Sequence, residues 1–207
     1  MRNHTLLLGL VATVLLLMIG PAAQANLISD GGFELGLTAG PNTFAIVPTG
    51  DPLGAWTVIG EKQVAMLGTP FDATGVPPFE GDEVLHLGEF RSNNGVMQSF
   101  PTAVGVEYQL HFSGIGWAGE PATVHVEVGD LVTDVAQIPS EWTTHSLTFT
   151  ATDSTSTLIL QNETSAGPGE NPGAVTIDAV SVVPEPTTLA LLGCGILAAA
   201  ATRRRRS

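Results

Sequence analysis

The chain has 207 residues, of which 43% are hydrophobic and only 13% are charged, and its formal net charge is −13. Between Asn26 and Val183 there are nineteen acidic residues and two basic ones, Lys62 and Arg91. That segment has no basic surface for nucleic acid and is repelled by anionic lipid. The single cysteine, Cys194, excludes a disulfide framework and a cysteine-ligated zinc site in the same segment.

The first 25 residues are predicted to be a secretory signal peptide. Arg2 is followed by an apolar run from Leu6 to Ile19 and then by Ala23-Gln24-Ala25. A positive start, an apolar run and an Ala-x-Ala end are the three parts of such a signal. We expect cleavage after Ala25. An uncleaved membrane anchor is the alternative that this pattern leaves open.

The C-terminal segment, residues 184–207, has three parts of its own. Pro184-Glu185-Pro186 is followed by sixteen mostly apolar residues, Thr187 to Thr202, and then by Arg203, Arg204, Arg205 and Arg206. As a helix, sixteen residues span about 24 Å, slightly less than a hydrocarbon core of ~30 Å. The arginines favour the cytoplasmic side, so the rest of the chain is expected outside. The prolines are expected to end a strand and hold the segment extended and accessible to a peptidase.

This three-part pattern resembles the PEP-CTERM sorting signal of Gram-negative bacteria. The resemblance implies recognition at Pro184-Glu185-Pro186 by an exosortase, a membrane-embedded cysteine peptidase, and removal of the tail. It also implies transient anchoring in the inner membrane through the C-terminal helix, followed by delivery to the cell surface or the extracellular matrix. Cys194 leaves with the tail on this reading.

Residues 26–183 are predicted to form one all-β domain. Short segments rich in β-branched residues alternate between apolar and polar positions and are separated by turn residues such as Asn93-Asn94-Gly95. We expect nine strands, at residues 56–59, 63–67, 83–87, 95–100, 107–112, 123–128, 143–150, 157–160 and 175–183. Nine short strands indicate a β-sandwich or jelly roll. Segments 69–78, 114–121 and 165–173 are expected to be surface loops.

Seven short motifs, in order along the domain, resemble those of galactose-binding-like sandwiches. They lie at Asn26–Glu34, Trp56, Phe79–Leu87, Val96–Phe100, Gly105–Phe112, Trp142–Thr150 and Ile177–Val182. Ser29-Asp30 departs from the usual asparagine of the first motif. The resemblance implies a single jelly roll of the carbohydrate-binding-module type.

That resemblance also implies one structural calcium ion between Glu34 and Asp178. In several families of this fold, an acidic residue after the N-terminal Phe and the Asp of the last strand share the ion. Calcium takes six to eight oxygen ligands from carboxylates and backbone carbonyls. The alternative is that Glu34 and Asp178 accept hydrogen bonds from backbone N–H groups.

A sugar site needs an aromatic face against which a pyranose ring can stack. Trp117 stands between glycines in an expected loop and is the candidate ligand-binding residue. Trp56, Trp142 and Tyr108 are expected to pack in the core.

The sequence offers no catalytic residues. Glycosidases need two carboxylates about 5–9 Å apart, but nineteen acids produce pairs by chance. Glu80, Asp82 and Glu83 are therefore interpreted as a solvated acidic face. The histidines His86, His111, His125 and His145 have no metal-binding spacing and are expected at exposed strand positions.

The hypothesis that follows is an exported, non-catalytic surface or matrix protein that binds carbohydrate, with exopolysaccharide as the expected ligand. One alternative is a structural or adhesive matrix protein without a sugar site, whose acidic surface is crosslinked by divalent ions. A glycan hydrolase is the other alternative.

Overall fold

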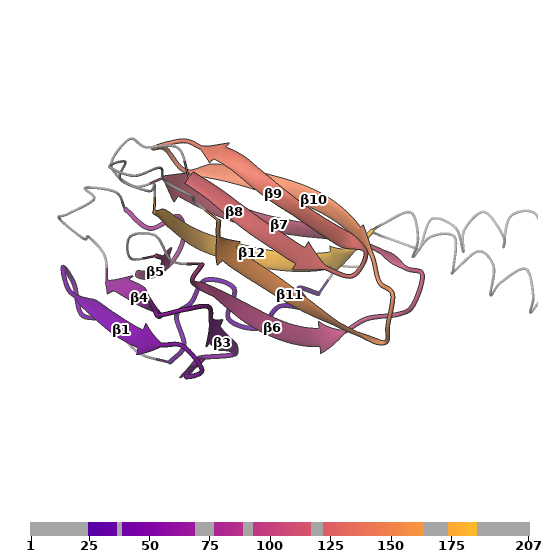
Figure 1. The fold of residues 1–207 in the computed structure, drawn as a ribbon, viewed down its shortest axis with the longest axis horizontal. Coiled ribbons are helices and arrows are strands. Elements are labelled where there is room, and N and C mark those ends of the chain that lie inside the picture. The colour runs from indigo at the N-terminus through magenta and orange to yellow at the C-terminus, as the bar shows by residue number, and fades with distance from the viewer. Residues whose placement is uncertain are drawn as a thin grey trace, which may run out of the picture.

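The computed structural model describes residues 25–36, 39–68, 77–88, 93–116, 122–163 and 174–185. Within those ranges the chain forms two six-stranded sheets packed face to face (Figure 1). The strands are β1 (Phe44–Pro48), β2 (Pro52–Leu53), β3 (Trp56–Ile59), β4 (Gln63–Gly68), β5 (Glu83–Leu87), β6 (Gly95–Pro101), β7 (Glu107–Gly116), β8 (Ala122–Val128), β9 (Leu131–Ile138), β10 (Thr143–Thr150), β11 (Thr155–Asn162) and β12 (Val175–Pro184). The predicted all-β sandwich is confirmed.

Every strand pairing in the two sheets is antiparallel. Sheet A has the order β1-β4-β5-β12-β7-β10, and sheet B has the order β2-β3-β6-β11-β8-β9. The last strand, β12, therefore lies in the middle of sheet A, between β5 and β7.

Each of the nine predicted strands is present, and the described residues contain three strands that were not predicted, β1, β2 and β9. The loop expected at 114–121 is partly wrong. Residues 114–116 continue β7, and Ile115 is buried there. Residues 117–121 lie outside the described ranges, as do most of the loops expected at 69–78 and 165–173.

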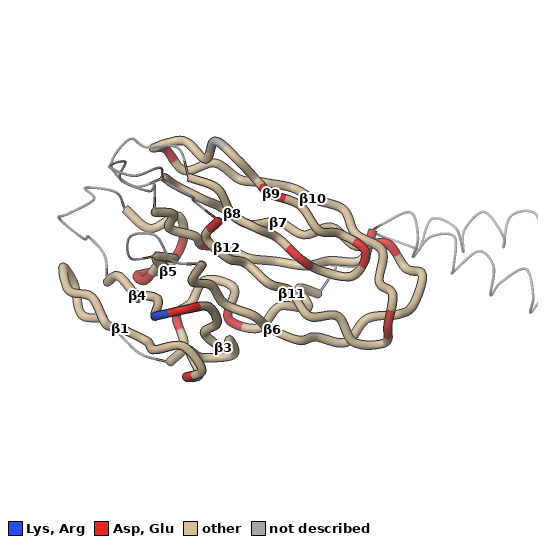
Figure 2. The backbone as a smooth tube through the Cα atoms, viewed as in Figure 1, with Lys and Arg blue, Asp and Glu red and all other residues tan. Residues whose placement is uncertain are grey.

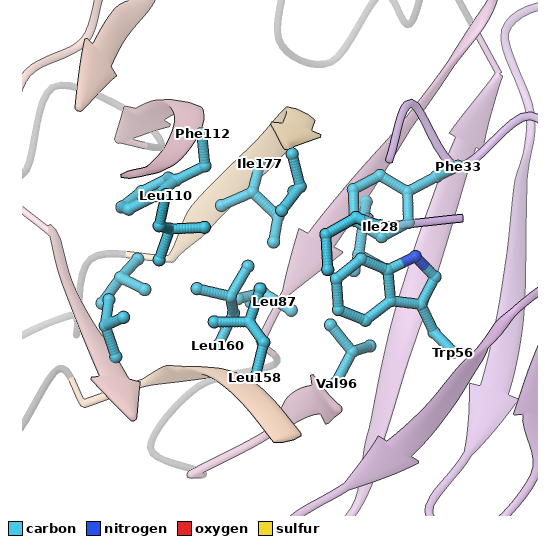
Figure 3. Packing of buried hydrophobic residues seen from close by; sticks show 14 of the residues in the cluster. Ile28, Phe33, Trp56, Leu87, Val96, Leu110, Phe112, Leu158, Leu160 and Ile177 are labelled. Carbon is cyan, nitrogen blue, oxygen red and sulfur yellow. The ribbon is translucent and has the colours of Figure 1, made fainter. Parts of the chain in front are cut away.

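The core fills the space between the sheets because alternate residues of each strand point inward. In β8, Val124, Val126 and Val128 are buried, while His125 and Glu127 face outward. Figure 3 shows Ile28, Phe33 and Trp56 on one side of this core and Leu110, Phe112 and Ile177 on the other. Leu87, Leu158 and Leu160 lie between the two groups.

Two aromatic pairs anchor the core. The Trp56 ring lies 5.4 Å from that of Phe33, and its indole N–H donates to the carbonyl of Asp30 at 2.9 Å. Tyr108 stacks on Phe149 at 5.4 Å, and its hydroxyl accepts a hydrogen bond from the N–H of Ala103 at 2.9 Å. The predictions that Trp56 and Tyr108 pack in the core are confirmed.

The N-terminal segment lies along the end of the last strand. The N–H of Leu27 donates to the Val182 carbonyl at 2.9 Å, and the N–H of Val180 donates to the Gly31 carbonyl at 2.9 Å. A Cβ on Gly31 would stand 1.9 Å from the carbonyl oxygen of Val180, so only glycine allows this approach. The two ends of the domain are thereby joined.

Acidic residues are spread over the strands and turns of the sandwich, as Figure 2 shows. Among the described residues, Lys62 is the one basic side chain against this acidic surface. The described ranges contain no helix long and apolar enough to cross a membrane. The predicted signal peptide (except Ala25) and the predicted C-terminal helix lie outside those ranges.

Candidate functional site

Glu34 and Asp178 hold one loop, residues 77–83, from two sides. Glu34 follows the N-terminal Phe33 and is exposed. Its Oε1 accepts hydrogen bonds from the N–H of Asp82 at 2.9 Å and of Glu83 at 3.0 Å. The loop therefore enters β5 with two backbone N–H groups bound to a carboxylate that lies 48 and 49 residues earlier in the chain.

Asp178 binds the other part of the same loop. Its Oδ2 accepts from the N–H of Phe79 at 3.1 Å and of Glu80 at 2.9 Å, and its Oδ1 accepts from the N–H of Ala179 at 2.7 Å. Ala179 has φ of +52°, and the register between β12 and β7 shifts between Asp178 and Ser181. This bulge locally interrupts the ladder and re-aims side chains, as bulges do.

The Asp178 carboxyl is completely buried. Burial raises its pKa to about 7, against the lowering effect of its backbone hydrogen bonds, and the nearby Glu80 carboxylate raises it further. No lysine or arginine among the described residues forms a salt bridge that could offset this cost. The group therefore exchanges a proton near neutral pH.

Two more carboxyls beside this loop have incomplete hydrogen bonding. Asp30 Oδ2 and Glu83 Oε1 are buried and accept no hydrogen bond within the described part of the chain. Burial is the largest cause that raises the pKa of each, and the charge of Glu34 adds to both shifts. The interpretation of Glu83 as part of a solvated acidic face is wrong, because its side chain is only 4% exposed.

The predicted calcium ligands thus bind two different parts of one loop, and both carboxylates already accept hydrogen bonds from backbone N–H groups. The described residues contain no group of three or more His, Cys, Asp or Glu side chains able to hold a metal. A calcium ion at Glu34 and Asp178 would therefore have to complete its coordination with backbone carbonyls and water. The residues fit such an ion through the buried carboxyl of Asp178, which forms no salt bridge within the described ranges.

Trp142, just before β10, packs against Phe79 of the same loop. Phe79 and Trp142 meet edge to face with ring centroids 5.9 Å apart, and the Trp142 indole N–H donates to the Pro77 carbonyl at 2.8 Å. Phe79 is 46% exposed, and Trp142 is half-buried. The expectation that Trp142 packs in the core is therefore wrong. Trp117, the predicted ligand-binding residue, lies outside the described residues.

The outer face of sheet B differs from this loop in its lack of aromatic rings along two rows of paired residues. Two rows of facing residues cross it: Thr57, Met97, Ile159, Glu127 and Val132, then Ile59, Gly95, Gln161, His125 and Asp134. Neither row contains Trp, Tyr or Phe, so these positions offer no such ring for a sugar. Among the aromatic pairs of the described residues, Phe79 and Trp142 are the pair in which neither side chain is buried.

None of the four histidines is fully exposed, contrary to the expectation for most of them. His86 faces Thr176 at 3.1 Å, and burial lowers its pKa to about 4. His145 stacks on Phe112 at 5.1 Å, and burial lowers its pKa as well. His125 pairs with Asp134 at 2.7 Å on sheet B.

The predicted processing residues fall at the edges of the described structure. Ala25 is exposed. Pro184 is the last residue of β12, and the N–H of Glu185 donates to the Glu107 carbonyl at 3.0 Å. The start of the motif is therefore extended, as expected, and continues sheet A, where Pro184 and Glu185 are half-buried. Pro186 and Arg203 to Arg206 lie outside the described ranges.

Comparison with known proteins identifies the C-terminal segment. Residues 182–206 match the PEP-CTERM protein-sorting motif. This motif implies an exported protein that is anchored transiently at the membrane and processed by an exosortase. No curated protein sequence matches the chain.

Solved structures share the fold of the domain. The carbohydrate-binding module TmCBM61, solved with β-1,4-galactotriose, aligns with a TM-score of 0.53 and 18% identity over 78% of this chain and 99% of its own. An arabinose-bound α-L-arabinofuranosidase, MgGH51, aligns at 0.50 and 15% identity over 80% of this chain but only 27% of its own. The CBM22-1 xylan-binding domain from Paenibacillus barcinonensis Xyn10C aligns at 0.46 and 15% identity, over 80% and 97%. The alignments at TM-scores of 0.53 and 0.50 show that the domain has the β-sandwich fold of these two structures.

Proposed function

We propose that the chain is an exported, exosortase-sorted, non-catalytic protein of the cell surface or extracellular matrix whose sandwich binds carbohydrate. The observation that carries the proposal is the fold shared with TmCBM61 across nearly the whole of that module. The sorting motif supports delivery to the place where the producer's exopolysaccharide is found. We propose exopolysaccharide as the ligand class.

The aromatic residues support a sugar contact at two places. Phe79 presents a half-exposed ring that is fixed from the side by Trp142, and the adjacent Glu80 is an exposed hydrogen-bond acceptor. A rigid aromatic face with a nearby polar group is what pyranose recognition needs. Trp117 remains the second proposed contact, from the sequence alone.

A binding titration with the exported protein tests this proposal. Saturable binding to a polysaccharide panel is expected, with a loss of about tenfold in affinity in Phe79→Ala and in Trp117→Ala, since one stacked ring contributes on the order of 1–1.5 kcal/mol. Phe44→Ala is the matched control, because it removes another exposed phenyl ring, from β1. Equal affinity in all three variants would place any sugar site elsewhere.

We also propose one structural calcium ion at Glu34 and Asp178. The uncompensated buried charge of Asp178 supports it, because a divalent cation would offset the cost of burying this carboxylate. Such an ion would stabilise the contact between the N-terminal segment and the last strand.

Thermal unfolding with calcium and with a chelator tests the ion. Calcium at about a hundred times its dissociation constant is expected to stabilise the wild type by about 2.7 kcal/mol and to raise its melting temperature. Asp178→Ala is expected to remove this rise. A wild type whose melting temperature ignores calcium would refute the proposed ion and leave the carboxylates as acceptors of backbone hydrogen bonds alone.

A further inference from the structure

The sorting motif overlaps the folded domain. The matched segment starts at Val182, which is buried in the core, and β12 runs through Pro184. Val183 faces Gln109 and Pro184 faces Tyr108 in the register with β7. The Glu185 N–H donates to the Glu107 carbonyl at 3.0 Å, which extends this pairing into the motif.

The opposite edge of β12 is covered just before the motif. The Leu27 N–H donates to the Val182 carbonyl at 2.9 Å, and the Val182 N–H donates to Asn26 Oδ1 at 3.0 Å. Asn26 also accepts from the N–H of Ile28 at 3.0 Å, so its side chain is fixed in this position. Asn26 is the expected first residue of the mature chain. The new N-terminus and the sorting motif are thus side by side.

There is little chain between the domain and the tail. Only Pro186 separates Glu185 from the apolar stretch that starts at Thr187. Pro186 and Thr187 together extend the chain by at most about 7 Å beyond Glu185. While the tail is in the membrane, the end of β12, with the β6–β7 and β10–β11 turns beside it in Figure 1, is therefore held close to the bilayer. The motif is therefore not presented to the peptidase on a long linker.

We propose that the folded sandwich withholds the sorting motif, so that the membrane peptidase binds Pro184 and Glu185 only after the end of β12 has detached from β7. The inference rests on the proposed sorting function. A peptidase that binds an extended substrate uses the backbone groups of that substrate, and here the Glu185 N–H is already bound within the sheet. Detachment stops at Val182, because its side chain is in the core. It is thus a local opening of a strand end, of the kind that needs little free energy.

Moving the motif away from the sheet tests the proposal. Six residues, Gly-Ser repeated three times, are inserted between Val183 and Pro184 of the full chain, and tail removal is followed in a host that contains the peptidase. Freeing one backbone hydrogen bond of about 1 kcal/mol corresponds to about a fivefold larger population of the detached motif. Tail removal is expected to be faster by about that factor.

The control is the same six residues inserted between Gly169 and Glu170, which lengthens the chain but leaves the end of β12 as it is. A wild type that loses its tail, with the variant lengthened between Val183 and Pro184 no faster than this control, would overturn the withholding of the motif and leave the sorting function standing. A wild type that keeps its tail in the same host would overturn the sorting function itself, and the inference with it.

Discussion

In the calcium-free protein, with chelator present throughout, Asp178→Asn is expected to change the pH dependence of stability strongly. The wild-type carboxyl has a pKa of about 7 in the folded protein against 3.8 in the unfolded chain. Between these values the folded state binds the extra proton, so this group makes the wild type less stable as pH rises from about 4 to 7. Asparagine does not titrate and lacks this contribution. The difference between the two profiles is expected to accumulate to about 2–4 kcal/mol over that range.

His86 changes the stability with pH in the direction opposite to that of Asp178, so the two substitutions can be compared directly. Its pKa falls from 6.5 to about 4 on folding, so stability rises with pH between these values. In the wild type the two trends partly cancel. Asp178→Asn should therefore show a clear rise in unfolding free energy from pH 4 to 6.5, and His86→Gln a clear fall. Denaturant titrations at a series of pH values measure both, and parallel profiles for wild type and Asp178→Asn would contradict the assigned burial.

Trp56→Ala is expected to destabilise the domain by about 3–5 kcal/mol, which is the usual cost of removing a large aromatic side chain from a core. Trp56 is the buried first residue of β3, where it packs on Phe33 and donates to the Asp30 carbonyl. Its loss leaves a cavity and removes one of the two hydrogen bonds that this carbonyl accepts. Chemical denaturation of the secreted protein measures the effect.

Trp56→Phe separates the two contributions. It keeps most of the packing but loses the indole N–H, and is expected to cost about 1 kcal/mol from the hydrogen bond plus a small cavity. If Trp56→Ala costs no more than Trp56→Phe, then Trp56 does not anchor the N-terminal segment.

The strands that alternate cleanly could be predicted from the sequence, and those that do not were missed. In β9, Val135 and Ile138 are three residues apart, because the pairing with β8 is irregular between Ala122 and Val124. β1 has apolar residues on both faces, since Phe44 and Ile46 are exposed at the edge of sheet A. β2 has only two residues. Periodicity cannot reveal elements of these kinds.

For the site, the sequence predicted which carboxylates come together but not what they bind. Glu34 and Asp178 were expected to share an ion, and in the structure they bind one shared loop. Their hydrogen bonds to residues 79–83 join positions 48 to 99 residues apart, which no local pattern encodes. The burial of Glu83 and the pairing of Trp142 with Phe79 depend on the same long-range packing.

For the sorting motif too, the sequence predicted the parts of the motif but not their contacts. Its three parts were recognised from the sequence, and the match to residues 182–206 confirms them. That Glu185 bonds to Glu107 follows only from the position of β12 beside β7. Proline ends the strand as expected, but one residue inside the motif rather than before it.

The most direct measurement is a titration of the exported protein with the producer's own exopolysaccharide, in calcium and in chelator. A carbohydrate-binding sandwich predicts saturable binding that free oligosaccharides of the same polymer compete away. No binding at millimolar sugar in either condition would contradict the account. The fold would then serve a structural or adhesive role at the cell surface.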